Sequence, residues 1–172
     1  MRGTGDARAP FFTDEDEKKL LYELSQMSNP NHLRLTKLAL ATGFRRSELL
    51  NLTWRNIDLK KRIIYIHRKN CAASDNSYGL KIVPLPEKSQ KILDELSTRH
   101  GKIIELTKGA ARNGFDKARK KAGLETLRFH DLRHIAISRM WSSGMNALEI
   151  SACSGHRDIK MLMRYSHFQL SI

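Results

Sequence analysis

The sequence has few of the features that mark secreted or membrane proteins. Its 172 residues include two cysteines, Cys71 and Cys153, which are far apart and belong to no CxxC pair. Such thiols predict neither a disulfide framework nor a zinc site, so a reducing cytoplasm is the expected compartment. No apolar run approaches the roughly 18 residues of a membrane helix, and the N-terminus lacks the apolar stretch of a signal peptide. We therefore expect a cytosolic protein with no membrane partner.

Acidic residues are scarce relative to basic ones. The chain has 18 Asp and Glu against 31 Lys and Arg, which gives a formal net charge of +13. Such an excess favours a polyanionic partner, most often nucleic acid, although other basic proteins have no such partner. Hydrophobic residues make up 40% of the chain, enough for a core, and the length suits one compact domain.

Helical periodicity dominates the sequence. One stretch, 60–86, is different, because two β-branched and aromatic runs flank a polar loop and predict a hairpin. No alternating βαβ series is present, so the expected fold is mostly α with a small antiparallel β-sheet, of the α+β class. We expect residues 1–12 to be a flexible lead-in and 13–172 to form one domain. The predicted helices cover about 13–27, 30–42, 45–58, 86–97, 108–122, 130–144, 146–154 and 157–168.

The strongest candidate for chemistry is "HDLRH", from His130 to His134, at the start of a predicted helix. His130 and Arg133 are three residues apart and therefore share a helix face. Together they can donate hydrogen bonds to one oxyanion, above all a phosphate. The alternatives are a buried histidine beside a surface arginine, or a metal site formed by His130 and His134. The zinc-protease pattern HExxH is absent, and no third ligand is evident.

A second candidate is "ATGFRRSELLNL", in which Gly43 is expected to end a helix just before Arg45. An arginine at that junction lies near the amides of the next helix start, an environment that binds anions. The alternative is that Arg45 and Arg46 are simply solvated.

The hairpin offers two lysines, Lys69 at the end of its first strand and Lys81 at the start of its second. Either could place an ammonium in a DNA groove, although most hairpin lysines only keep sheet edges soluble.

The last motif, "SGHRDIKMLMRYSH", places His156 upstream of Tyr165 on a short segment. Its apolar residues Ile159, Leu162 and Met163 are expected to pack the last helix onto the body. A tyrosine in such a position is more often part of a core than a nucleophile, so the other motifs decide between these readings.

Taken together and in this order, the four motifs resemble the catalytic domain of the tyrosine recombinases, the phage integrase family, over roughly Asp14 to His167. The resemblance implies the fold of the DNA breaking-rejoining enzymes. It also implies that Tyr165 is the nucleophile and that Lys69, with Lys81 as second choice, is the hairpin lysine. The full set of implied catalytic residues is Arg45, Lys69, His130, Arg133, His156 and Tyr165, with Arg46, Arg68, Lys81 and His134 as further DNA contacts.

The resemblance implies a site-specific recombinase or integrase of a phage or other mobile element. Such an enzyme cleaves and rejoins double-stranded DNA through a 3′-phosphotyrosyl intermediate, with no metal, ATP or other cofactor. The chain begins at about the catalytic domain, so we expect the N-terminal DNA-clamp domain of the family to be absent. The expected partners are DNA and further protomers, as a tetramer on DNA in the full-length protein, with a monomer for this chain alone.

Two alternatives stay open at the level of sequence. A type IB topoisomerase uses a similar set of side chains to relax supercoiled DNA and rejoins the same strand. A DNA-binding remnant of an integrase, without catalysis, is the other.

Overall fold

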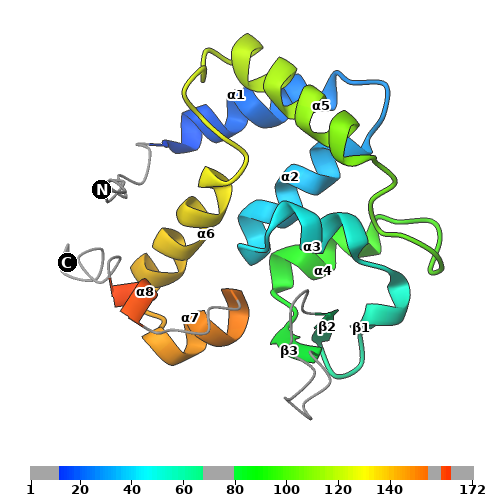
Figure 1. The fold of residues 1–172 in the computed structure, drawn as a ribbon, viewed down its shortest axis with the longest axis vertical. Coiled ribbons are helices and arrows are strands. Elements are labelled where there is room, and N and C mark those ends of the chain that lie inside the picture. The colour runs from blue at the N-terminus through cyan, green and yellow to red at the C-terminus, as the bar shows by residue number, and fades with distance from the viewer. Residues whose placement is uncertain (1–11, 68–79, 155–159, 164–172) are drawn as a thin grey trace, which may run out of the picture.

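The computed structural model describes residues 12–67, 80–154 and 160–163. In this part of the chain, helices make up most of the molecule and a small sheet lies at the end remote from the first helix (Figure 1). The helices are α1 (Asp14–Ser25), α2 (Asn31–Thr42), α3 (Arg46–Asn51), the 3₁₀ turn η1 (Trp54–Asn56), α4 (Glu87–Asp94), α5 (Lys108–Lys121), α6 (Asp131–Ser142), α7 (Ala147–Ser154) and α8 (Lys160–Met163).

The described strands form an antiparallel sheet in the order β1 (Ile57–Asp58), β2 (Ile63–His67), β3 (Leu80–Pro84). The pairing of Ile64 with Val83 and of Ile66 with Lys81 sets the register of the hairpin. The prediction of a mostly α fold with a small antiparallel sheet is thereby confirmed. The predicted polar loop of the hairpin lies outside the described residues.

The start of α1 follows directly from its sequence. Thr13 precedes the helix, and its hydroxyl accepts a hydrogen bond of 3.1 Å from the backbone N–H of Asp16. The Asp16 carboxylate in turn accepts one of 3.0 Å from the backbone N–H of Thr13. This reciprocal capping box satisfies amides that have no partner within the helix. Thr13 is therefore the N-cap of α1.

The third helix is shorter than predicted. The sequence indicated a helix over 45–58, but α3 ends at Asn51, and a 3₁₀ turn and strand β1 follow. The backbone at Leu52 is extended, with φ −70° and ψ 131°. The amide oxygen of Asn56 then accepts hydrogen bonds from the backbone N–H and the hydroxyl of Thr53, at 2.9 and 2.6 Å. These local side-chain bonds compete with the helical pattern, as Asn and Thr often do.

Helix α2 is the centre of the fold. It packs against α1, α3, α4, α5 and α6, and its residues Leu35, Leu38 and Ala39 are almost fully buried. A second cluster of buried side chains joins the last described helices, through Ile137 and Trp141 of α6, Ile150 of α7 and Leu162 of α8. The two clusters meet along α6, which begins at the "HDLRH" motif.

Two further predictions concern the N-terminal residues and the lack of a membrane helix. The predicted lead-in, residues 1–12, lies outside the described residues except for Phe12. Among the described helices, none combines the length and the apolar character that a membrane span needs.

Candidate active site

Arg133 lies at the start of α6 and is fixed by the ends of two other helices. Its Nη1 donates hydrogen bonds to the carbonyl oxygens of Gly43, at 2.5 Å, and Ser154, at 2.7 Å. Gly43 follows the last residue of α2, and Ser154 is the last residue of α7. Carbonyls at helix C-termini lack intrahelical partners and carry partial negative charge, so they suit a buried cation. The residue is only 4% exposed, and its guanidinium is therefore preorganised.

Gly43 shapes this junction through its backbone. Its φ of 68° is left-handed, a conformation that glycine adopts without the penalty that a Cβ brings. Its N–H closes α2 on the carbonyl of Ala39, while its own carbonyl turns toward Arg133. The prediction that Gly43 ends a helix just before Arg45 is confirmed.

Arg45 is the N-cap residue of α3 and is more exposed. Its backbone N–H donates to Oε2 of Glu48 at 2.7 Å, and its Nη1 donates to Oε1 of the same carboxylate at 3.1 Å. The side chain is 52% exposed. The neighbouring Arg46 places its guanidinium 5.8 Å from the ring centre of Phe129, a cation–π contact. Neither arginine is simply solvated.

His130 immediately precedes α6, and the charges of Arg133 and Arg45 both act on it. Burial lowers the pKa of its imidazole, and the positive charge of Arg133 lowers it further; Arg45 and Arg128 add smaller effects in the same direction, and Asp131 opposes them. The neutral imidazole, which can accept a proton, is therefore favoured near neutral pH. The ring of His134 meets that of His130 edge to face, with centroids 5.1 Å apart. In the described part of the chain, no group of three or more potential ligands completes the metal site considered for these histidines.

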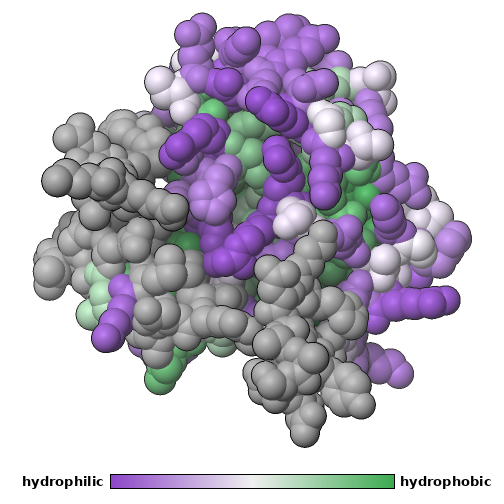
Figure 2. All heavy atoms as spheres, in the orientation of Figure 1, coloured by the Kyte–Doolittle hydropathy of each residue, from purple (hydrophilic) through white to green (hydrophobic). Residues whose placement is uncertain are grey.

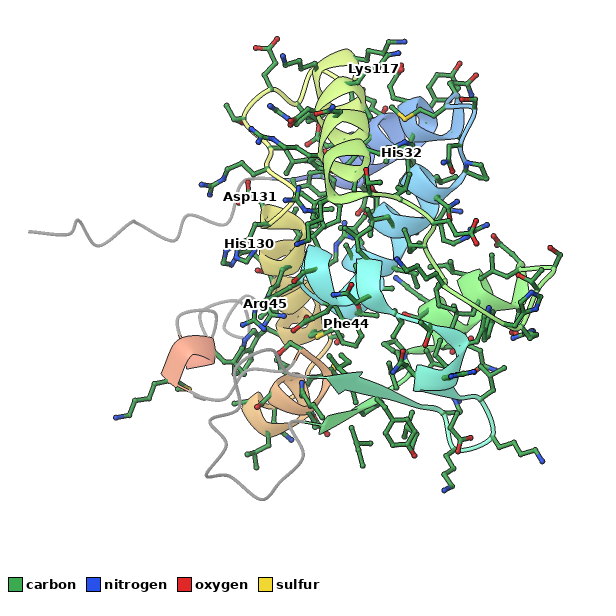
Figure 3. All side chains as sticks on the ribbon, turned by 45° about the vertical axis from the view of Figure 1, so that its right-hand side comes forward. His32, Phe44, Arg45, Lys117, His130 and Asp131 are labelled. Atoms are coloured by element: carbon green, nitrogen blue, oxygen red, sulfur yellow. The ribbon has the colours of Figure 1, made fainter. Side chains whose placement is uncertain are left out.

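Arg45, Arg46, His130 and Arg133 line one pocket of about 420 Å³. Figure 3 shows Arg45 and His130 on neighbouring elements, α3 and the start of α6, with side chains on the same side of the molecule. Figure 2 shows hydrophilic side chains over much of the face that Figure 1 turns toward the viewer, with hydrophobic residues between them. Three phenylalanines, Phe44, Phe115 and Phe129, contribute the apolar part of the lining. The arginines of the described walls are Arg45, Arg46, Arg112, Arg119, Arg128 and Arg133.

A phosphodiester is the ligand that this lining suits best, because guanidinium groups recognise phosphate oxygens with paired N–H donors. The sequence agrees with that geometry, since residues 10–171 match the model of the phage integrase family. The chain belongs to the phage integrase family.

Its curated relatives in this family are longer proteins. The chain is 37% identical to the shufflon-specific DNA recombinase of Escherichia coli over 135 residues, covering 77% of this chain and 33% of the relative. It is 29% identical to the integrase of Haemophilus phage HP1 over 161 residues, covering 92% of this chain and 43% of that protein. The chain thus spans between a third and a half of the length of these relatives.

The fold agrees with the same family. The solved catalytic domain of bacteriophage HP1 integrase superposes with a TM-score of 0.73 at 28% identity, covering 92% of this chain and 87% of that domain. The structure of XerA recombinase gives a TM-score of 0.66 at 20% identity and covers 91% of this chain. The expected DNA breaking-rejoining fold is therefore confirmed.

Of the residues that the integrase resemblance implied, the structure brings Arg45, His130 and Arg133 to one pocket. Arg46 joins them in the lining. His134 lies against His130, as described above. Of the other five, Lys81 lies in β3, whereas Arg68, Lys69, His156 and Tyr165 lie outside the described residues, and their roles stay predictions.

Lys81 lies at the start of the second hairpin strand, as the sequence predicted. An ammonium that enters a DNA groove has to be accessible, but Nζ of Lys81 is buried. Lys81 is the second residue of β3 and lies opposite Ile66. Its contact with DNA stays a prediction.

Sequence reasoning missed the part of the pocket that α5 contributes. Asp116 of α5 lies 2.8 Å from Nε of Arg119 and 3.8 Å from Nε of Arg112, and both arginines line the pocket. Arg128 is likewise paired with Asp131, at 3.0 Å. The spacing of Arg112, Asp116 and Arg119 on one helix face was a signal that could have revealed this charged surface.

Proposed function

We propose that this chain carries the catalytic centre of a site-specific recombinase that cleaves and rejoins double-stranded DNA. The observation that supports the proposal is the meeting of Arg45, His130 and Arg133 in one cationic pocket. These residues come from two motifs that are far apart in the sequence. Gly43 of the first motif and Arg133 of the second are separated by 90 residues. The E. coli relative is named a DNA recombinase, which favours the same activity for this chain.

The two arginines act on the phosphate under attack. A phosphodiester gains negative charge on its non-bridging oxygens as it becomes five-coordinate. Donors fixed in advance at that point stabilise the transition state, by about 10²–10³ in rate for one such donor. Arg133 is fixed by Gly43 and Ser154 and therefore needs little reorganisation when the substrate binds, whereas Arg45 is exposed and paired with Glu48 alone.

The proposed nucleophile is Tyr165. Its phenol has an ordinary pKa of about 10 and needs help at neutral pH. His130, with a pKa below its ordinary value, accepts the phenolic proton. The tyrosine oxygen then bonds to phosphorus, the bond from phosphorus to the 5′-oxygen breaks, and Lys69 gives that oxygen a proton. His156 donates a hydrogen bond to the phosphate, and the 3′-phosphotyrosyl link is reversed by a 5′-hydroxyl.

The proposed partners are a DNA duplex and further protomers on that DNA. The net charge of +13 supports binding to a polyanion. For this chain without DNA we propose a monomer, which light scattering would test, because a stable tetramer would contradict it. A cytosolic location is part of the same proposal.

Covalent trapping tests the proposed activity. On a nicked suicide substrate, which loses the leaving strand, the parent chain is expected to form a protein–DNA adduct that resists SDS. Tyr165→Phe should bind DNA like the parent and form none. Tyr22→Phe is the matched control, because Tyr22 is 62% exposed on α1 and should leave adduct formation unchanged.

Three results would count against the proposal. Failure of both the parent and Tyr165→Phe to form an adduct would favour a DNA-binding module without catalysis. An adduct with Tyr165→Phe would rule out Tyr165 as the nucleophile. Relaxation of supercoiled plasmid without preference for any site would favour a type IB topoisomerase.

A further inference from the structure

Lys81 occupies an inward-facing position of the hairpin. Along β3, Val83 is fully buried and Ile82 is 58% exposed, so the strand alternates between the core and solvent. Because successive side chains of a strand point to opposite faces, Lys81 shares the inner face with Val83. Its Nζ is buried, whereas lysines of hairpins are usually exposed at the edge. A buried ammonium is costly unless its surroundings compensate for the lost water.

The element packed on this part of the hairpin is α7, which contacts both β3 and α6. The charge of Lys81 acts on Cys153 in the last turn of α7. Burial raises the pKa of the Cys153 thiol, and the nearby Lys81 ammonium partly offsets that rise, while Glu149 adds to it. The ammonium therefore lies near the C-terminal end of α7. A helix C-terminus is a favourable place for a cation, because its last carbonyls and the helix dipole are negative there.

The same helix end holds Arg133. Ser154, the residue after Cys153, accepts the 2.7 Å hydrogen bond from Nη1 of Arg133 through its carbonyl oxygen. Ser154 is itself 2% exposed, and its hydroxyl donates to the carbonyl of Ile150 at 2.6 Å. The last turn of α7 is thus approached by one cation from the sheet and by another from α6.

We propose that Lys81 is a positioning residue, which fixes the end of α7 on the hairpin and so places the Ser154 carbonyl that orients Arg133. The proposal rests on the recombinase function proposed above. It separates Lys81 from the proton donor, because the buried ammonium of Lys81 acts on the reaction through the end of α7 and Arg133. Lys69 then remains the residue of the hairpin that gives the leaving oxygen its proton.

The first experiment measures single-turnover cleavage of a suicide duplex by the full chain. Lys81→Met removes the charge and keeps most of the side-chain length, and it should slow cleavage by roughly 10-fold to 100-fold, the scale of a small misplacement of a catalytic group. DNA affinity should change by less than about twofold, because Nζ does not face the solvent. Lys81→Arg keeps the charge and should recover part of the rate. Lys60→Met, an exposed lysine in the turn before β2, is the matched control and should cleave like the parent.

A second substrate separates positioning from proton donation. Replacing the bridging 5′-oxygen by sulfur creates a leaving group that departs without a proton. This substrate compensates for the loss of a proton donor, so the cleavage rate of Lys69→Met should recover on it. The cleavage rate of Lys81→Met should remain as far below that of the parent as it is on the oxygen substrate. Recovery of Lys81→Met on the sulfur substrate would overturn the proposal and make Lys81 a proton donor.

A third measurement does not depend on cleavage. In the parent, the Arg133 guanidinium hydrogens should exchange slowly with solvent because carbonyls of Gly43 and Ser154 accept them. Lys81→Met should speed that exchange in the folded protein, and Lys60→Met should not. Unchanged exchange would overturn the proposal even if the parent chain forms no DNA adduct. An absent adduct with faster exchange would instead refute only the proposed recombinase activity.

Discussion

The two arginines of the pocket are held in opposite ways. Arg133 is 4% exposed and donates to two main-chain carbonyls at helix ends, whereas Arg45 is 52% exposed and is paired with one carboxylate on its own helix. A buried cation on carbonyls is part of the tertiary structure, because its removal leaves buried acceptors without a donor. An exposed ion pair contributes little to stability. The site therefore combines one arginine that the fold requires with one that the fold tolerates losing.

The largest expected effect is on cleavage by Arg133→Lys. An ammonium cannot reproduce a planar guanidinium that meets two carbonyls and a phosphate at once. The single-turnover rate on a suicide substrate should fall by about 10²–10³. Arg45→Lys is the comparison, and its loss should be smaller because its partner is a flexible carboxylate. An Arg133→Lys variant as active as the parent would remove the basis of the contrast.

The next largest expected effect is on the free energy of unfolding, which should fall more when Arg133 is replaced than when Arg45 is. Arg133→Met leaves the carbonyls of Gly43 and Ser154 unsatisfied in a buried place, so the free energy of unfolding should fall by about 2–4 kcal/mol. Arg45→Met breaks an exposed pair and should cost less than about 1 kcal/mol. Urea unfolding followed by circular dichroism measures both. Equal losses would show that the carbonyl contacts do not stabilise the fold.

A smaller effect is expected when the support of Arg45 is weakened. Glu48→Gln keeps the size of the side chain and removes the charge that pairs with Nη1 of Arg45 at 3.1 Å. The cleavage rate should fall only a few-fold, by about 1 kcal/mol or less in activation free energy. Glu87→Gln, at an exposed pair with Lys91 on α4, is the matched control and should have no effect on cleavage. A loss as large as that of Arg133→Lys would mean that Arg45 also depends on a fixed support.

The smallest expected effect is on the titration of His130, which senses both arginines. NMR should place its pKa below the ordinary value of about 6.5, because burial and the two positive charges disfavour the protonated ring. The imidazole therefore stays neutral as pH falls to that value, and cleavage should decline only once it becomes protonated at lower pH. Arg45→Gln should move the pKa of His130 upward. A pKa above 6.5 in the parent would contradict the role of proton acceptor.

Much of the fold and part of the site could be predicted because local side chains encode them. Thr13 caps α1, Gly43 ends α2, and the spacing of His130 and Arg133 puts both at one helix start. The end of α3 was misplaced because the bonds between Thr53 and Asn56 outweigh helix propensity there. The two-residue spacing of Lys81 and Val83 was a local sign that Lys81 faces inward, whereas the packing of β3 on α7, which is remote in sequence, had no such sign.

The carbonyl contacts of Arg133 have a consequence for how this protein can vary. Gly43 and Ser154 contribute main-chain oxygens, and a main-chain oxygen is present whatever amino acid occupies the position. What the chain must conserve at 154 is the length of α7 and the point at which it stops. Deleting one residue of α7 would rotate its last carbonyl by about 100°, given 3.6 residues per turn. Because Ser154 is 2% exposed, we expect the protein to accept only small side chains at 154, and to reject insertions or deletions just before it.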